Sequence, residues 1–167
     1  MTPPEPLRPR HDLSGFDCGR ASMNDWLRQR ALKWQSNNGA RVVVLADGGA
    51  VRAYYALSSG AVRRAEAPKA MGRNTPDPLP IILLGRLAVD QRLHGKGVAR
   101  DLMLDAFERT YAVSQQVGVV ALVVHALDER LAGFYEKLGF RRAPQAGEEL
   151  TFFKPLKDIT AEIEGGQ

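Results

Sequence analysis

The spacing of apolar side chains predicts an amphipathic helix over residues 24–35. Ser22 stands just before it as a candidate N-cap. The apolar stripe of this helix consists of Trp26, Leu27, Ala31 and Trp34. Because both tryptophans share that stripe with Leu27 and Ala31, we expect them in the core rather than on a base-stacking surface.

A hairpin follows this helix. Residues 41–46 form an apolar, β-branched run, and residues 51–58 form a second run with two tyrosines. Between them lies Asp47-Gly48-Gly49, which is typical of a tight turn. Residues 63–80 carry four prolines and a glycine, so we expect a long loop there, and long loops in compact domains are often functional.

The second half of the chain alternates between strand and helix patterns. We predict strands over 81–89, 117–125 and 150–154, and helices over 95–112 and 129–138, the last ending at Gly139. The fold class predicted is therefore α/β, with a central mixed sheet flanked by helices. Residues 11–156 would form one domain, after an extended N-terminal segment (1–10) and before a polar, acidic tail (157–167).

The composition indicates how the core is stabilised and which compartment suits the protein. A hydrophobic content of 44% suffices for a core without metals or disulfides. The lone cysteine, Cys18, forms no disulfide within the chain, which favours a reducing compartment, and we expect a cytoplasmic protein. No stretch has the pattern of a signal peptide or of a membrane span, and no Cys/His/carboxylate cluster suggests a metal site.

The charge is uneven along the chain. Residues 1–100 carry 16 basic and 8 acidic groups, whereas residues 101–167 carry 7 basic and 11 acidic groups. This asymmetry favours an anionic partner for the first hundred residues, although a solvated surface would give the same count.

The chemistry is concentrated in Leu87-Ala-Val-Asp-Gln-Arg-Leu-His-Gly-Lys-Gly-Val-Ala-Arg100. Here a buried strand enters a turn with Gly95 and Gly97 that opens a helix. Unpaired amides at a helix N-terminus, with glycines that permit close approach, favour a bound pyrophosphate. The turn lacks the Gly-Lys-Ser/Thr of a P-loop and the three-glycine spacing of a dinucleotide site. Taken alone, this pattern favours an ordinary tight strand–helix turn over a ligand site.

Arg92-x-x-Gly95-x-Gly97 after Val89-Asp90 resembles the acetyl-CoA loop of the GNAT acetyltransferases, and Phe134-Tyr-Glu-Lys-Leu-Gly-Phe140 is similar to their closing helix and turn. The resemblance implies acetyl-CoA as acetyl donor and no metal. It also implies that the strand backbone holds the pantetheine arm and that the turn holds the pyrophosphate. The residues concerned are Leu87, Ala88, Val89, Arg92, His94, Gly95, Lys96, Gly97, Val98, Ala99 and Arg100.

Tyr135 is the candidate catalytic residue implied by this resemblance. A phenol with a pKa of about 10 is protonated at neutral pH and can supply a proton to the leaving thiolate. The alternative is a half-buried core tyrosine; with Phe134 and Leu138 as core anchors, Tyr135 would face elsewhere. For His125, at the end of a predicted strand, we favour a structural role over that of a base.

Further segments resemble one branch of the family, the bacterial tRNA-acetylating toxins of toxin–antitoxin modules. They are His11-Asp-Leu-Ser-Gly-Phe-Asp17, Asn24-Asp-Trp-Leu-Arg28, Ala31-Leu-Lys33, Tyr54-Tyr-Ala-Leu57, Leu83–Asp90 and Val124-His-Ala-Leu-Asp128. This resemblance spans most of residues 11–156. It implies aminoacyl-tRNA as acceptor, a cognate DNA-binding antitoxin and a homodimer, with no membrane association.

Five basic residues are candidates for binding the tRNA: Arg28, Arg30, Lys33, Arg41 and Arg86. Arg86 lies within an apolar strand, where a structural ion pair is an equal alternative. Two other functions remain open. One is a GNAT enzyme that acetylates a protein or small-molecule amine, and the other is a GNAT-like protein that binds CoA or nucleic acid without catalysis.

Overall fold

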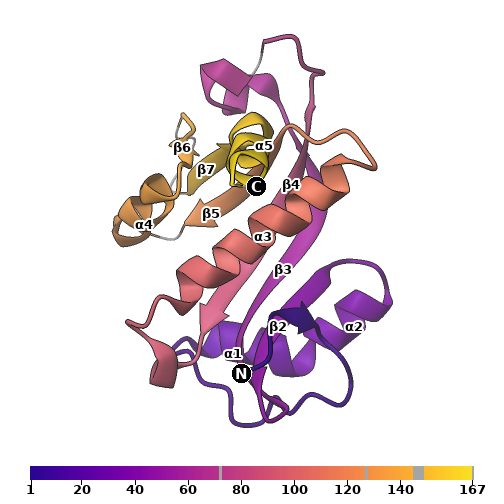
Figure 1. The fold of residues 1–167 in the computed structure, drawn as a ribbon, viewed down its shortest axis with the longest axis vertical. Helices are drawn as coiled ribbons and strands as arrows, with labels where there is room; N and C mark the ends of the chain where they lie inside the picture. Colours follow the sequence, from indigo (N-terminus) through magenta and orange to yellow (C-terminus); the bar gives the residue numbers. More distant parts are fainter. Residues whose placement is uncertain (72, 127, 145–148, 167) are drawn as a thin grey trace. The chain divides into compact units, whose positions relative to one another are not determined.

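The strands of this chain hydrogen-bond in the order β1-β2-β3-β4-β5-β7-β6 (Figure 1). The computed structural model describes residues 1–71, 73–126, 128–144 and 149–166. The described strands are β1 (Glu5–Pro6), β2 (Arg41–Asp47), β3 (Ala50–Val62), β4 (Leu79–Val89), β5 (Ala121–Ala126), β6 (Arg141–Arg142) and β7 (Leu150–Pro155). The β4–β5 pair is parallel and the β1–β2, β2–β3, β5–β7 and β6–β7 pairs are antiparallel, which confirms the predicted mixed sheet.

Five α-helices accompany these strands in the described residues: α1 (Ala21–Gln29), α2 (Ala31–Ser36), α3 (Val98–Ser114), α4 (Ala132–Lys137) and α5 (Leu156–Gly165). Short 3-10 turns occur at η1 (Arg64–Glu66), η2 (Lys69–Met71), η3 (Gln91–Leu93) and η4 (Glu129–Leu131). None of the helices in these residues has the length and apolar character needed to cross a bilayer. The chain divides into two compact units, residues 1–58 with 85–105 and residues 59–84 with 106–167.

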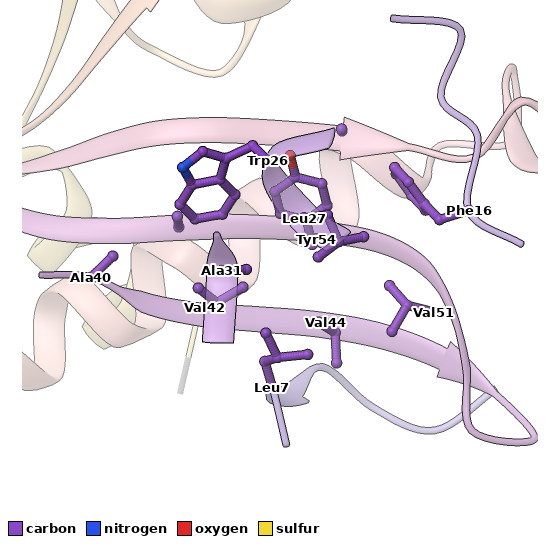
Figure 2. Close-up of a cluster of buried hydrophobic side chains, with 12 residues drawn as sticks. Leu7, Phe16, Trp26, Leu27, Ala31, Ala40, Val42, Val44, Val51 and Tyr54 are labelled. Atoms are coloured by element: carbon purple, nitrogen blue, oxygen red, sulfur yellow. The ribbon is translucent and has the colours of Figure 1, made fainter. Parts of the chain in front are cut away.

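The first unit is built on the β2–β3 hairpin, which the sequence pattern predicts correctly. Gly48 and Gly49 have φ values of 58° and 86° in its turn, a region that glycine adopts without strain. Along the strands, alternate residues enter one core, including Val42 and Val44 on β2 and Tyr54 on β3. Figure 2 shows this core, in which these side chains meet Trp26, Leu27 and Ala31 of the helical segment.

The helical segment of this unit differs from the prediction. Helix α1 begins at Ala21, before Ser22, and the chain breaks at Arg30 into two helices. Arg20 stands at the N-cap without a side-chain capping bond, and its carbonyl oxygen accepts the amides of Met23 and Asn24, so Ser22 lies inside the first turn. The Asn24 side chain accepts from the amide of Cys18 at 2.9 Å and donates to Asp17 Oδ1 at 3.0 Å, which ties this turn to the segment before it. The expectation that both tryptophans are buried is wrong for Trp34, which is 46% exposed.

The second unit contains the β4–β5–β7 ladder. Its core includes Ile81, Val123 and Phe153, one from each of these strands. The predicted strand over 117–125 begins only at Ala121, and Val117 is exposed. The paired register of β5 with Ile81 and Pro155 starts at residue 121. Val120 still bonds to both neighbours, to the Pro80 carbonyl oxygen and from the Leu156 amide, each at 2.9 Å, so the bonding to neighbouring segments begins at residue 120.

Two further segments of this unit gain structure that the pattern does not predict. The loop expected over 63–80 contains η1 and η2 and passes into β4 at Leu79. Helix α5, residues 156–165, begins one residue before the predicted acidic tail (157–167) and covers most of it, and its Ile159 is fully buried. The helix expected over 129–138 is divided into η4 and α4, and Gly139 follows it with a φ of 90°, as predicted for a C′ residue.

Candidate active site

The turn after β4 is organised by the buried carboxylate of Asp90. Its Oδ1 accepts the amide of Arg92 and its Oδ2 accepts the amide of Asp17, both at 3.0 Å. The amide of Gln91 donates in turn to the carbonyl oxygen of Asp17 at 2.9 Å. Burial opposes ionisation of Asp90, but these amide donors and the nearby guanidinium groups hold its pKa below the ordinary value. Asp90 therefore ties the start of the turn to the segment that precedes α1.

The two glycines of the turn leave an open approach to backbone amides. Gly95 and Gly97 have φ values of 76° and 79°, and a Cβ added at either would meet nothing within 4 Å. Helix α3 begins at Val98, directly after them. In the described part of the chain, the amides of residues 95–100 have no hydrogen-bond partner. Free amides at the positive end of a seventeen-residue helix form a site suited to a phosphate group.

Exposed side chains, three of them from Arg or Lys, surround this turn. Arg92, His94, Lys96 and Arg100 are all exposed. The His94 Nε2 lies 2.7 Å from the carbonyl oxygen of Val89. Since a carbonyl oxygen only accepts, Nε2 carries the proton, and this contact fixes the ring against the end of β4. The predicted pyrophosphate residues are thus brought together in one turn with the required free donors.

The strand before the turn offers backbone groups of its own. The β4–β5 ladder ends at the Leu84–Val124 pair, so this ladder does not use Leu87, Ala88 or Val89. These three residues are the ones predicted to hold the pantetheine arm. Their position in β4, immediately before the glycine turn, is compatible with that role.

Arg86 stands beside these residues on β4 and is half-buried. Its guanidinium carbon lies 4.9 Å from the centroid of the Trp26 ring, and its Nη1 lies 3.5 Å from the Met23 sulfur. In the part of the chain that is described, no carboxylate lies within salt-bridge distance of it. The contact that holds Arg86 is therefore a cation–π interaction, and the ion-pair alternative has no partner there.

Tyr135 lies on α4 in the second unit, and its side chain is buried. Its ring contacts Phe134, Phe140 and Phe152, with centroid separations of 5.3, 5.5 and 5.5 Å. The expected helix face is wrong: Phe134 and Leu138 are half-buried, whereas Tyr135 is 7% exposed. Apolar spacing does not determine which face of this short helix packs inward; the rings of Phe140 and Phe152 lie against Tyr135 and place that face in the core.

His125 is supported as a structural residue. Its Nδ1 lies 3.0 Å from the Thr151 hydroxyl and 3.8 Å from Glu149 Oε1. Residues 125 and 151 are paired across β5 and β7, so the contact follows from the ladder register. These contacts favour a structural role for His125, since its imidazole is paired with the Thr151 hydroxyl. No cluster in the described residues could hold a metal ion.

Four of the predicted tRNA-binding residues lie on the helical segment or at the start of β2. The side chains of two of them bond to neighbouring residues, and those of the other two do not. Arg28 donates to the carbonyl oxygen of Phe16 at 2.7 Å, and Arg41 donates to Gln35 O at 3.2 Å and to Asn38 Oδ1 at 3.0 Å. Arg30 and Lys33 are exposed, and within the described ranges their side chains have no hydrogen-bond or ion-pair partner. Arg28 and Arg41 thus stabilise local structure, while Arg30 and Lys33 are available for a ligand.

Sequence reasoning missed two features of this unit, the clamp from Asp90 to Asp17 and the exposure of Trp34. Asp17 and Asp90 both lie in segments that resemble the family. Sequence spacing does not predict, however, that these two residues contact each other. Helical spacing alone predicts that Trp34 lies in the core. The break at Arg30 was the missing information, since it ends the stripe.

Comparison with known proteins agrees with this geometry. The family described as "Acetyltransferase (GNAT) domain" matches residues 37–142. The tRNA-acetylating toxin of Mycobacterium tuberculosis is 39% identical over 160 residues, covering 96% of this chain and 95% of that protein.

Two solved structures are also similar. AtaT complexed with acetyl-methionyl-tRNAfMet has a TM-score of 0.88 at 31% identity and covers 96% of this chain and 98% of its own. A mutant AtaT toxin bound to the C-terminus of the antitoxin AtaR and acetyl-CoA has a TM-score of 0.80 at 31% identity, covering 98% and 97%. With the glycine turn and the mixed sheet in place, the chain belongs to the GNAT acetyltransferase family, in the group that includes the tRNA-acetylating toxins.

Proposed function

We propose that this enzyme transfers the acetyl group of acetyl-CoA to the α-amine of aminoacyl-tRNA, and that it acts as the translation-blocking toxin of a toxin–antitoxin module. The observation that carries the proposal is the turn at residues 90–100, with free amides and exposed cations, in a chain 39% identical to a tRNA-acetylating toxin. AtaT, a structural relative, is known with acetyl-CoA and with acetyl-methionyl-tRNAfMet.

The donor would lie along β4 and the turn. The backbone of Leu87–Val89, beyond the end of the β4–β5 ladder, would hydrogen-bond the pantetheine amides, as a strand bonds an added peptide. The amides of residues 95–100 would bind the pyrophosphate, with Lys96 and Arg100 supplying positive charge. Asp90 would keep this turn in place through Arg92 and Asp17.

The transfer itself needs little from the protein beyond positioning and one proton. The neutral amine attacks the thioester carbonyl carbon, and a tetrahedral intermediate forms. The C–S bond then breaks, the amine loses its extra proton to solvent, and the CoA thiolate takes a proton from the Tyr135 hydroxyl. The tyrosinate that remains regains a proton from solvent, so the net reaction gives the amide and CoA thiol with the enzyme unchanged. Loss of one positioned acid typically costs about a hundredfold to ten-thousandfold in rate.

The acceptor is proposed from its chemistry as well as from the relatives. An α-amine has a pKa of about 7.7–8.0, compared with about 10.4 for lysine, so it is far more often neutral at pH 7. Such an amine suits an enzyme without an obvious strong base among its described residues, in which His125 lies 3.0 Å from the Thr151 hydroxyl. Arg30 and Lys33 would contact the phosphate backbone of the tRNA.

Acetylation converts the nucleophilic amine into an amide, which cannot attack the peptidyl ester, so translation stops. A cell that makes such an enzyme needs to restrain it. We therefore propose a cognate DNA-binding antitoxin, as AtaT is known with the C-terminus of AtaR. We also expect a homodimer, which sedimentation of the purified protein would test.

A cell-free translation reaction tests the function. Adding the protein with acetyl-CoA should stop synthesis, while protein alone or acetyl-CoA alone should not. Synthesis should resume when fresh charged tRNA is added with an inhibitor of the enzyme. Continued synthesis alongside acetylation of a ribosomal protein or a small amine would instead support the broader acetyltransferase function. Failure to release CoA with any acceptor would support a non-catalytic binding protein.

A further inference from the structure

Trp34 presents an indole ring to solvent on α2. Its exposed fraction is 46%, whereas Trp26, eight residues earlier, is 5% exposed. The two rings meet edge to face, with centroids 5.9 Å apart. Trp34 therefore packs against a buried neighbour while a large part of its ring faces solvent. Exposing a large aromatic side chain forgoes the free energy that its burial would provide.

The surroundings of this ring are cationic. Arg30 stands at the N-cap of α2, and its carbonyl oxygen accepts the Trp34 amide at 2.8 Å, so it begins the helical turn that carries Trp34. Lys33 is adjacent in the sequence. Neither cation has an ion-pair partner in the described residues, and the sequence contains no acidic residue between Trp26 and Ala46. We call Arg30, Lys33 and Trp34 the α2 surface.

The α2 surface is connected to the acetyl-CoA strand through Trp26. The Trp26 ring contacts Trp34 on one side and receives the Arg86 guanidinium at 4.9 Å on another. Arg86 is the residue directly before Leu87–Val89 on β4. Figure 2 shows Trp26 in the core of this unit, close to Leu27 and Tyr54. A single side chain therefore separates Trp34 from a residue of the strand proposed to hold the donor.

We propose that Trp34 stacks on an unpaired base of the single-stranded 3′ end of the tRNA, while Arg30 and Lys33 contact the adjoining phosphates. This inference rests on the proposed function. An aromatic ring beside free cations is the arrangement that single-stranded nucleic acid recognises, because bases stack and phosphates pair with charge. A duplex offers no free base face to such a ring.

A second copy of this chain is a poorer occupant of the same surface. A symmetric dimer contact would place Arg30 and Lys33 of one copy opposite the same cations of the other, with no acidic residue nearby to compensate. An anionic ligand removes this repulsion. The charge pattern therefore favours nucleic acid over self-association.

The test measures binding of an uncharged tRNA and of the same tRNA from which the unpaired 3′ nucleotides have been removed. Trp34→Ala should weaken binding of the intact tRNA by about 5-fold to 150-fold, the usual range for one stacked base. Trp34→Phe should recover most of the loss, because it restores a ring. With the shortened tRNA, wild type and Trp34→Ala should bind equally.

Salt dependence separates stacking from charge. Lys33→Gln should reduce the slope of log Kd against log salt by about 0.7 to 1, while Trp34→Ala should leave the slope unchanged. Val117→Ala provides a control, since it removes an exposed apolar side chain from another part of the chain and should bind tRNA as the wild type does.

Three results would overturn the stacking proposal. They are equal affinity of Trp34→Ala and wild type for intact tRNA, an equal loss with shortened tRNA, and a change of oligomeric state in Trp34→Ala, which would place the ring between copies of the chain. Failure of the proposed function gives a different result, because the wild type itself would then transfer no acetyl group to charged tRNA.

Discussion

Lys154 and Leu138 are joined by a hydrogen bond of 2.7 Å from the buried ammonium group to the carbonyl oxygen at the end of α4. The same ammonium donates to Glu162 of α5 at 2.7 Å and lies 4.9 Å from the Phe107 ring centroid. Gly139 makes room for it, since a Cβ there would collide with Nζ. Lys154 thus fixes the end of the helix that carries Tyr135.

Replacing Lys154 with methionine should lower the free energy of unfolding by about 1–3 kcal/mol, because the Leu138 carbonyl loses its donor in a buried setting. Urea unfolding measures the change. Lys157→Met is the matched control, since Lys157 is exposed on α5 and should tolerate the change. If both variants unfold at the same urea concentration, Lys154 does not stabilise this end of α4.

Gly97→Asp should reduce acetyl-CoA affinity on the order of 100-fold or more, because a carboxylate would face the pyrophosphate. Calorimetry with the folded variant measures this. Gly49→Asp is the control: Gly49 also has a positive φ, 86°, and open space around it, but lies in the β2–β3 turn. Unchanged affinity in Gly97→Asp would remove the turn from the donor site.

Tyr135→Phe should preserve the fold, since the ring contacts with Phe140 and Phe152 remain, and should preserve acetyl-CoA affinity. Turnover at saturating substrates should fall by about a hundredfold to ten-thousandfold. Tyr111→Phe, which removes a hydroxyl that donates to Glu164 at 2.9 Å, should keep the wild-type rate. A Tyr135→Phe rate within about twofold of wild type would exclude the phenol as proton donor when chemistry is rate-limiting.

Asp90→Asn should alter the pH dependence of stability. The folded-state pKa of Asp90 is lowered: burial opposes ionisation, but the Arg92 and Asp17 amides and nearby guanidinium groups outweigh it. A lowered pKa contributes stability above the unfolded value, near 3.8, and this contribution is lost as the pH falls through the folded pKa. The free energy of unfolding of Asp90→Asn should therefore be lower than that of wild type at about pH 6, with the difference shrinking below about pH 4. A constant difference over this range would show that the Asp90 charge is not involved.

The sequence predicts best where periodicity and turn chemistry agree. The strand ending at Val89, the glycine turn and the hairpin at Gly48 and Gly49 were all predictable, because local residues determine them. Contacts between distant segments were not: the Asp17–Asp90 clamp and the Lys154–Leu138 bond depend on the tertiary fold. The exposure of Trp34 and the burial of Tyr135 differ from the prediction because the helix breaks at Arg30 and because Tyr135 packs against Phe140 and Phe152 from other parts of the fold. The spacing of apolar residues along the sequence predicts neither the break at Arg30 nor the burial of Tyr135.

The most direct measurement uses labelled acetyl-CoA, purified protein and a mixture of charged tRNAs. We predict label on the α-amine of charged tRNA, none on the same tRNA after deacylation, and a rate that falls in Tyr135→Phe. Recovery of the labelled N-acetyl amino acid after mild hydrolysis of the ester would locate the acetyl group. If no charged tRNA accepts label while a protein lysine or a free small amine does, aminoacyl-tRNA is not the acceptor.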